Sequence, residues 1–388
     1  MTGQDIVCLA TQGWDEHWTP VQQVMLRLAP RNRILYVEPF HGLFSGRRQG
    51  KSAQDPSAAP VPPLREVRPN LWVYRPSYPY LPGNMRLPGA NLLNEPIYRA
   101  ELRSAMARMG MSKPWLWAFF AQGLSVLDLP FRGVIYDCVD DWPSFFPDPR
   151  EKSFVQRIDE QLCRRADIVF VGSDPLLEKK KPFNQRTFVV NHAADIQHFM
   201  KAADAELEVP ADLACLPHPR IGFVGMIDEL RFDVGLIAEL AKDPARQVVI
   251  VGGFMGNSRR LVPERPNVHV LGMKTVEQLP AYLKGMDVLI MPYTLSETTR
   301  YIYPLKLYEY LSTGKPVVAT PIPAVNTLAD YMYVADTPTD FVAHVQTALA
   351  ETGTVEFERR REKARLHTWE AHVQRKELLI EEHLTGGQ

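Results

Sequence analysis

The chain has 388 residues, of which 45% are hydrophobic and 23% are charged, and its formal net charge at pH 7 is −1. The length predicts two domains of about 200 residues each, and the composition is that of an ordinary globular protein. The near-neutral charge excludes a general attraction to nucleic acid or to membranes, and four widely spaced cysteines without a C-x-x-C pair argue against a zinc site or a disulfide framework.

The amino-terminal residues lack the basic and then apolar order of a signal peptide, and no apolar run reaches the roughly 18 to 20 residues that cross a bilayer. We therefore expect a cytoplasmic protein without a nucleic-acid partner. Short basic runs such as Arg259-Arg260 lie in polar surroundings that are typical of a solvated face. They leave peripheral contact with the inner face of the membrane as an alternative.

The first half of the chain alternates apolar strands with segments of helical spacing, which predicts a parallel sheet covered on both faces. A helix is predicted over 151–166, where apolar residues recur at helical spacing. Residues 45–70 are rich in proline and glycine, and we expect them to form a long mobile loop. The predicted strands are 6–10, 33–37, 71–74, 115–120, 134–137, 168–171 and 187–190.

A domain junction is predicted between 191 and 219, where the chain is rich in alanine, aspartate and proline. A new strand, turn and helix start at 220, and the alternation then repeats. From about 339 to 385 the sequence is predicted to be helical. The further predicted strands are 248–251, 268–271, 288–291 and 317–320, and the predicted helices between strands are 232–240 and 276–284.

The stretch 301–319 predicts a loop, a short helix and a strand that together suit a nucleotide diphosphate. Pro304 fits the first turn of a helix, and Gly314 followed by a proline ends it. Free N–H groups at the helix start would attract phosphate oxygens, and Lys306 adds a full positive charge. Glu309, one turn further, offers a carboxylate to two ribose hydroxyls. The alternative explanation is a surface ion pair between Lys306 and Glu309.

This segment resembles the donor site of the GT-B glycosyltransferases, specifically the large retaining group with a Glu-x7-Glu pattern. In that group the second glutamate binds the donor ribose, and it corresponds here to Glu309. The first glutamate corresponds to Tyr301, so the chain departs from the pattern there. The Pro-Leu-Lys variant is similar to bacterial cell-surface polysaccharide transferases of the teichuronic acid type. The resemblance covers most of the chain, and its specific motifs lie between 272 and 321.

The resemblance implies an α/β GT-B fold in which two Rossmann-like domains face one another across a cleft. An acceptor-binding domain would cover 1–195, a nucleotide-sugar-binding domain 196–368, and a helix over 369–388 would cross back to the first domain. It also implies transfer of a sugar, with retention, from a UDP- or GDP-sugar to a hydroxyl of a carbohydrate or lipid-linked acceptor. We expect no metal and no other cofactor, since cationic side chains would meet the leaving diphosphate.

The turn at 222–229 lacks the G-x-G-x-x-G pattern, which weakens any case for NAD or FAD. Arg231, at the start of the next helix, is expected to bind the diphosphate as a bidentate donor, and a salt bridge to Asp228 or Asp233 is the alternative. Arg231 and Lys306 are predicted catalytic residues. The predicted donor-binding residues are Gly13, Gly225, Met226, Met273, Lys274, Tyr301, Tyr303, Pro304, Leu305, Lys306 and Glu309.

In the first domain, residues 11–18 directly follow the first strand, at the edge where α/β sheets bind ligands. Gly13 corresponds to the glycine of the loop that the family places near the donor phosphates and the acceptor. Trp14 offers a flat apolar face to a sugar, although burial is the commoner fate of a tryptophan. His17 is a candidate general base.

Asp137, Asp140 and Asp141 end another strand at the same expected edge. Three carboxylates in five residues are costly to bury, because like charges oppose one another's ionisation. We therefore expect Asp140 to orient or deprotonate the acceptor hydroxyl as the third catalytic residue, with Asp137 and Asp141 binding the acceptor. The alternative is that Asp140 or Asp141 caps a helix.

Two other functions remain open for the chain. A sugar-nucleotide epimerase of the same fold would convert its donor without any acceptor, so incubation of the donor alone distinguishes it. A non-catalytic sugar-nucleotide-binding subunit is suggested by Tyr301 at the position of the family glutamate.

Overall fold

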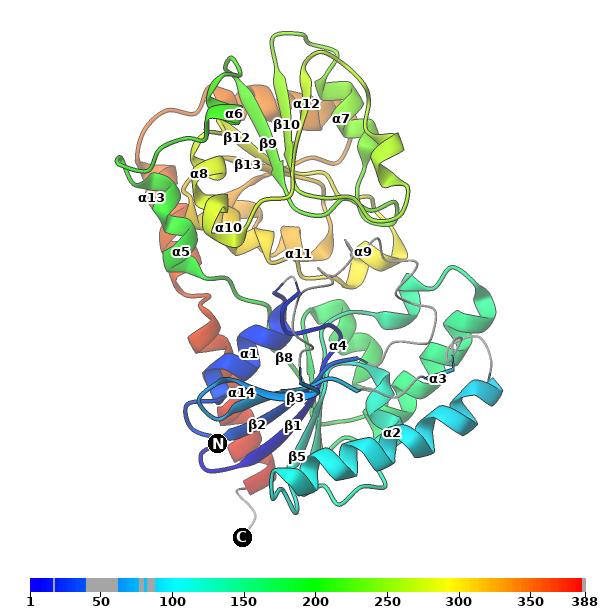
Figure 1. Cartoon of the computed structure of the whole chain (residues 1–388). Coiled ribbons are helices and arrows are strands. Elements are labelled where there is room, and N and C mark those ends of the chain that lie inside the picture. Colours follow the sequence, from blue (N-terminus) through cyan, green and yellow to red (C-terminus); the bar gives the residue numbers. More distant parts are fainter. Residues whose placement is uncertain (17, 40–61, 77–79, 82–87, 386–388) are drawn as a thin grey trace. The chain divides into compact units, whose positions relative to one another are not determined.

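The computed structural model describes residues 1–16, 18–39, 62–76, 80–81 and 88–385, without the side chains of 88–92 and 385. The chain divides into two compact units (Figure 1). Unit 1 contains Met1–Asn191 and Val373–Gln388, and unit 2 contains His192–His372.

Unit 1 is built on an eight-stranded sheet with the order β3-β4-β2-β1-β5-β6-β7-β8. All neighbouring pairs are parallel except β3 and β4, which are antiparallel. The predicted parallel sheet is therefore confirmed. The strands are β1 (Asp5–Leu9), β2 (Arg33–Val37), β3 (Leu64–Arg68), β4 (Leu71–Tyr74), β5 (Trp115–Ala118), β6 (Gly133–Cys138), β7 (Ile168–Val171) and β8 (Thr187–Val189).

Helices cover both faces of this sheet, because successive strand residues point alternately to the two sides. Ile6 and Cys8 of β1 pack with α1 and α14, while Val7 and Leu9 pack with α2 in a second core. Apolar residues at helical spacing make α1 amphipathic, and Thr19 closes a capping box at its start. The helices are α1 (Pro20–Leu28), α2 (Pro88–Arg108), α3 (Pro149–Arg165), α4 (Asp174–Lys180) and α14 (Trp369–Ile380), with 3₁₀ turns η2 (Ala121–Val126) and η3 (Trp142–Phe145).

The carboxyl-terminal helix crosses back to the first unit, as the sequence analysis predicts. α14 starts in unit 2, and its residues from Val373 onward belong to unit 1. Val373, Leu379 and Ile380 lie in the same core as α1. The π-helical turn Glu381–Thr385 follows, and there His383 stacks on Phe188 of β8 with ring centroids 4.6 Å apart.

The expectation of one mobile loop over 45–70 is wrong at its carboxyl-terminal end. Residues Leu64–Arg68 form the edge strand β3, which pairs with Leu71–Tyr74 through a tight turn. Asn70 has a φ of 65° in this turn, a conformation that asparagine tolerates better than most residues. The segment is rich in proline, so the weak alternation of apolar and polar residues over Leu64–Arg68 does not stand out in the sequence. Residues 45–61 of the predicted loop lie outside the described residues.

Unit 2 contains a six-stranded sheet with the order β11-β10-β9-β12-β13-β14, in which every neighbouring pair is parallel. The chain builds outward from β9 through β10 to β11, and then returns to the other side of β9 with β12. The strands are β9 (Arg220–Val224), β10 (Gln247–Val251), β11 (Val268–Gly272), β12 (Val288–Met291), β13 (Val317–Ala319) and β14 (Tyr333–Val334). The short strand β14 is not among the predicted elements.

The two faces of this sheet also pack against separate sets of helices (Figure 1). One face meets α5, α8, α10 and α11, and the other meets α7 and α12. The segment predicted as one helix over 276–284 is a 3₁₀ turn, η6 (Val276–Gln278), followed by α8. The helices are α5 (Ile196–Met200), α6 (Ala211–Ala214), α7 (Val234–Leu240), α8 (Leu279–Lys284), α9 (Glu297–Tyr301), α10 (Lys306–Ser312), α11 (Pro323–Asn326), α12 (Pro338–Leu349) and α13 (Val355–Arg365), with 3₁₀ turns η4 (Lys201–Ala203), η5 (Ser258–Leu261) and η7 (Ala329–Tyr331).

Candidate functional site

Three adjacent strands of unit 2 run into glycines at their carboxyl ends. Gly225 follows β9, Gly252 follows β10, and Gly272 ends β11, with φ values of 145°, 147° and 73°. A Cβ atom on Gly252 would overlap the carbonyl of Gly225, so the two backbones touch directly. We call Gly225, Gly252, Gly253 and Gly272 the glycine floor. It exposes main chain at the sheet edge where parallel α/β sheets bind ligands.

Lys306 lies on this floor. Its ammonium group approaches Gly225 so closely that a Cβ atom there would overlap the Nζ and Cε atoms, and it also lies 5.4 Å from the ring centroid of Phe223. Tyr310 of the same helix anchors α10 to the end of β9, because its hydroxyl accepts a hydrogen bond of 2.8 Å from the amide of Val224. The position between β9 and β12 is the point where the strand order reverses, which is the usual ligand position in such sheets.

Four charged side chains surround this position. Burial lowers the pKa of Lys306, and the charge of Arg231 lowers it further, while Glu309 and Asp228 oppose the shift. Burial likewise raises the pKa of Glu309, and Lys306 opposes that change. Both groups are therefore held where charge is costly, unlike the two members of a solvated surface pair.

Arg231 forms an ion pair with Asp228, with Nε 2.7 Å from Oδ2, which is the alternative that the sequence left open. Asp228 also accepts hydrogen bonds from the amides of Leu230 and Arg231, so it fixes the turn that carries the arginine. The Arg231 side chain is still 30% exposed. The ion pair therefore positions the guanidinium on a side chain that remains partly exposed.

The start of the α10 helix differs from the prediction in one respect. The helical turn begins at Pro304 as expected, but the amide of Leu307 donates to the Pro304 carbonyl, and the amides of Tyr308 and Glu309 donate to the Leu305 carbonyl. The amides of Leu307, Tyr308 and Glu309 are therefore satisfied by the preceding turn and are not available to phosphate. The positive charge at this point comes from the side chain of Lys306.

Two methionines lie beside the glycine floor. A Cβ atom on Gly253 would meet the Sδ atoms of Met273 and Met226 at 2.8 and 3.0 Å. Met273 is exposed, and Met226 is partly buried. Lys274, by contrast, pairs with Asp212 at 2.9 Å and lies over the ring of Tyr282. This lysine is therefore already engaged by a neighbouring helix.

Of the two predicted tyrosines, Tyr303 is buried. Its hydroxyl lies 2.7 Å from the hydroxyl of Tyr308, and its carbonyl accepts a 2.8 Å hydrogen bond from Nδ1 of His192. The side chain belongs to the core of unit 2, which leaves only its backbone for a ligand. Tyr301 ends α9 and is partly exposed, as are Pro304 and Leu305.

In unit 1, the loop that carries Gly13 is fixed from several sides. The Gly13 amide donates to Glu16 at 3.3 Å, and the Gly13 carbonyl accepts from Gln22 at 3.2 Å. Trp14 is only 6% exposed and packs edge-on against Tyr36, so its predicted contact with a sugar is replaced by the burial alternative. The predicted base His17 lies outside the described residues.

Glu38, which follows β2, contacts this loop and was missed by the sequence analysis. Its buried carboxylate accepts a 2.9 Å hydrogen bond from the Trp14 amide and pairs with Arg75 at 2.7 Å. The sequence signal that could have identified Glu38 was its position directly after the predicted apolar strand 33–37.

Asp137 is a structural residue, and its assignment to the acceptor is wrong. The side chain is 4% exposed, accepts a 3.0 Å hydrogen bond from Nε1 of Trp117, and forms an ion pair with Lys376 of α14. Burial lowers the pKa of Lys376, and the carboxylate of Asp137 opposes this shift. The lysine is distant in sequence, so only the packing of α14 reveals this partner.

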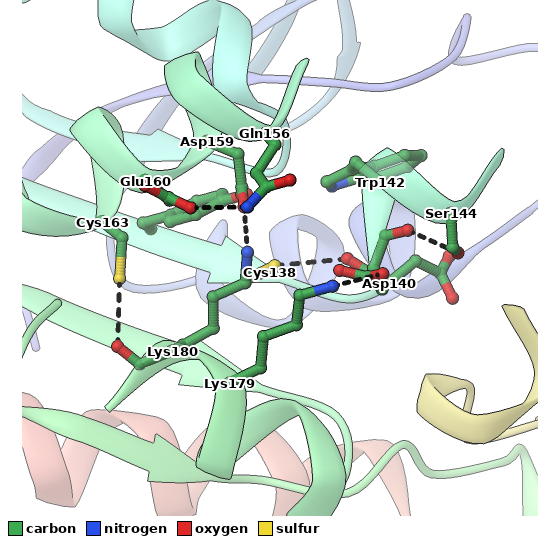
Figure 2. Close-up of polar contacts among 12 residues, drawn as sticks. Cys138, Asp140, Trp142, Ser144, Gln156, Asp159, Glu160, Cys163, Lys179 and Lys180 are labelled. Carbon is green, nitrogen blue, oxygen red and sulfur yellow. Dashed lines mark hydrogen bonds and ion pairs between the residues drawn. The ribbon is translucent and has the colours of Figure 1, made fainter. Parts of the chain in front are cut away.

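Asp140 and Asp141 follow β6, and Figure 2 shows the region around them. The Asp140 carbonyl accepts from the amide of Trp142 at 3.0 Å and from the thiol of Cys138 at 3.3 Å. Asp141 is fully buried, and one carboxylate oxygen accepts from Lys179 at 2.8 Å. Asp141 precedes η3 without capping it through its side chain. Asp140 is partly exposed and is the more accessible carboxylate of the two.

A second buried polar network, which includes Asp159 and Lys180, lies near these aspartates (Figure 2). Asp159 of α3 pairs with Lys180 of α4 and accepts a hydrogen bond from the hydroxyl of Tyr136, and both charged side chains are 1% exposed. Removal of one partner from such a pair leaves an uncompensated buried charge. The network therefore connects α3 and α4 to β6, the strand that Asp140 follows.

Comparisons with known proteins agree with this architecture. Residues 218–351 match the family model described as glycosyl transferases group 1. Over 253 residues, the chain is also 29% identical to a protein of Bacillus subtilis (strain 168) named as a teichuronic acid biosynthesis glycosyltransferase. That match covers 61% of this chain and 64% of the length of the relative.

Solved structures share the fold of the whole chain. A sucrose-phosphate synthase from Thermosynechococcus elongatus superposes with a TM-score of 0.71 at 16% identity, covering 99% of this chain and 100% of its own. Anabaena HepE in complex with UDP-glucose gives 0.68 at 15% identity, covering 97% and 99%. The two parallel-sheet units thus form a GT-B-like α/β fold, and the predicted fold class is confirmed. Among the described helices, none has the length and apolar character to cross a membrane.

Proposed function

We propose that this protein is a glycosyltransferase that moves a sugar from a nucleotide-diphosphate sugar to a hydroxyl of a carbohydrate or lipid-linked acceptor. The observation that carries the proposal is the position of Lys306, an ammonium group on a floor of bare backbone at the switch point of the unit 2 sheet. A diphosphate suits this arrangement, because the glycines leave the strand ends without side chains of their own and the ammonium group supplies a cation for the phosphate oxygens.

Lys306 and the exposed part of Arg231 would bind the diphosphate, and Glu309 would accept hydrogen bonds from the ribose hydroxyls. During transfer the bond between the anomeric carbon and the phosphate oxygen breaks, and the nucleoside diphosphate leaves with the electron pair. The acceptor oxygen forms the new bond, and its proton passes to the phosphate or to Asp140. At an effective dielectric constant of about 20, one cation about 4 Å from a phosphate charge contributes on the order of 4 kcal/mol.

Only the part of this interaction that is gained in the transition state speeds the reaction. If half of it is differential, each cation contributes roughly 30-fold in rate. Positive charge on the protein therefore supplies the stabilisation of the leaving group, and the proposed reaction uses no metal ion.

The relatives support the finer assignments. One is named for teichuronic acid biosynthesis, and HepE binds UDP-glucose, which favours a UDP-sugar donor and a role in cell-surface polysaccharide synthesis. We extend the proposal to retention of the anomeric configuration and to a cytoplasmic location with peripheral contact at the inner membrane face. An epimerase or a non-catalytic binding subunit is not favoured by these relatives.

The test replaces Lys306 and Glu309 by alanine one at a time and measures sugar transfer from UDP-glucose and related donors. We expect each variant to lose at least about tenfold in transfer rate, since each removes one charge-assisted contact to the donor. Lys242, an exposed surface lysine, provides a matched control as Lys242→Ala. Unchanged transfer in both site variants, with all proteins folded, would refute the site.

A further inference from the structure

Two side chains of α10 contact consecutive residues at the end of β9. Lys306 lies against Gly225, and the hydroxyl of Tyr310 contacts the backbone of Val224. Lys306 and Tyr310 are four positions apart, so they lie one turn apart on the same face of the helix. The position of the ammonium group over the glycine floor is therefore linked, through a single helical turn, to the contact that Tyr310 makes.

Tyr310 takes the place of a strand neighbour of β9. In the described structure β12 pairs with β9 as far as Gly222, whereas β10 pairs with β9 as far as Val224. Successive residues of a parallel strand direct their backbone groups to opposite neighbours, and the Gly225 amide donates to Val251 of β10 at 2.8 Å. Val224 therefore faces the other side, where β12 has already separated from β9. There the Tyr310 hydroxyl accepts a 2.8 Å hydrogen bond from the Val224 amide and donates to the Val224 carbonyl at 3.3 Å.

Tyr310 adds no charge to the site. Burial raises the pKa of its hydroxyl well above the ordinary value of a tyrosine, so the group stays protonated and neutral at neutral pH. The charges that act on Lys306 are those of Glu309, Arg231 and Asp228. Loss of the Tyr310 hydroxyl leaves all of these charges in place and therefore acts on the geometry of α10.

Other contacts hold α10 on its opposite side. Tyr308 is two positions from both Lys306 and Tyr310, so it points away from the face that they share. Its ring is buried and stacks on His367 with ring centroids 4.0 Å apart, and its hydroxyl lies 2.7 Å from that of Tyr303. These contacts do not depend on the end of β9. Removal of the Tyr310 hydroxyl is therefore expected to shift α10 without unfolding it.

We propose that Tyr310 is a positioning residue for the donor diphosphate, because its hydroxyl replaces a strand partner between β9 and β12 and thereby fixes Lys306 over Gly225. This inference rests on the proposed function, and it names the group that sets the position of the donor helix on the sheet. Tyr310 is not among the predicted site residues, because its partner Val224 is 86 positions away in the sequence.

The experiment is a double-mutant cycle on UDP binding by the full chain. Tyr310→Phe keeps the ring and removes the hydroxyl, and we expect it to lower UDP affinity by about fivefold in the otherwise unchanged protein. In a Lys306→Ala background the same substitution should lower UDP affinity by less than about twofold, because the ammonium group whose position it controls is absent. Calorimetric titration with UDP measures all four proteins.

Tyr308→Phe is the matched control, since it removes the hydroxyl of a second buried tyrosine of α10 on the side away from Gly225. Both tyrosine variants lose one buried hydrogen bond and should lower the midpoint of urea unfolding to a similar extent, but Tyr308→Phe should bind UDP like the unchanged protein.

Three results would each overturn the proposal: unchanged UDP affinity in Tyr310→Phe, an equal loss in both lysine backgrounds, or the same loss in Tyr308→Phe. If the unchanged protein binds no UDP, the proposed function and this inference fail together. UDP binding without any sugar transfer removes the proposed activity and leaves the role of Tyr310.

Discussion

The carboxyl edges of the two sheets are formed by different types of residue. In unit 2, the strands β9, β10 and β11 run into Gly225, Gly252 and Gly272, and the side chain of Lys306 lies over the backbone at Gly225. In unit 1, the corresponding edge is filled with large or charged side chains, including Glu38 after β2 and the aromatic residues Phe120, Trp142 and Phe145 after β5 and β6. Both edges belong to similar parallel sheets.

This difference shows how one architecture can serve two kinds of ligand. A floor of glycine lets an anion reach main-chain groups, and recognition then depends on the backbone and on a few cations. An edge of locked side chains instead presents a shaped surface whose chemistry can vary without changing the sheet. Asp137 and Lys376 of unit 1 pair with one another inside the protein, whereas Lys306, Glu309 and Arg231 of unit 2 surround one position at the sheet edge.

The largest expected effect is on the stability of unit 1, at the buried ion pair of Asp137 and Lys376. Lys376→Met leaves the Asp137 carboxylate buried without its cation, and we expect the free energy of unfolding to fall by about 4 kcal/mol. The double variant with Asp137→Asn should recover most of this loss, since no unpaired charge remains. Urea denaturation measures both. A loss of under about 1 kcal/mol in the single variant would show that the pair is not structural.

A smaller effect on stability is expected from the glycine floor. Gly252→Ala forces a Cβ atom onto the Gly225 carbonyl at a φ of 147°, and we expect a loss of about 3 kcal/mol together with weakened nucleotide binding.

Gly256 is the matched control, because it also has a positive φ, 59°, but has open space around its Cβ position. Gly256→Ala should cost about 1 kcal/mol, from backbone strain alone. Thermal unfolding and calorimetric titration with UDP compare the two variants. Equal behaviour would mean that the close approach of the strands at Gly252 has no consequence.

The smallest expected effect is the pH dependence of nucleotide binding. Only the protonated form of Lys306 attracts the diphosphate, and burial lowers the pKa of this group below that of an ordinary lysine. UDP affinity should therefore fall as the pH rises through the lowered pKa, by about tenfold or 1.4 kcal/mol. Lys306→Arg keeps its charge throughout this range and should bind UDP without the alkaline loss. Identical pH profiles for Lys306→Arg and the unchanged protein would show that Lys306 does not bind the diphosphate.

Much of the fold is visible in the sequence. The strands of both sheets appear as short apolar runs bounded by glycine and proline, and α10 is marked by Pro304 and Gly314. Lys306 and Glu309 could be singled out because they lie one turn apart on that helix. β3 could not be predicted, since its alternation is weak and lies next to a proline-rich segment, and its pairing with β4 supplies the stability that its own residues lack.

Local pattern and composition determined the two parallel sheets and the lysine of the candidate donor site, because these depend on periodicities and signals within a few residues. The return of the last helix to the first unit was implied by the family resemblance. Tertiary structure alone decided which charges are already paired and which surfaces remain open. Asp137 meets Lys376 across 239 positions, and Phe120 meets Trp142 through neighbouring strands. The reason is physical: burial and electrostatic pairing depend on distances in space, which the order of residues along the chain does not contain.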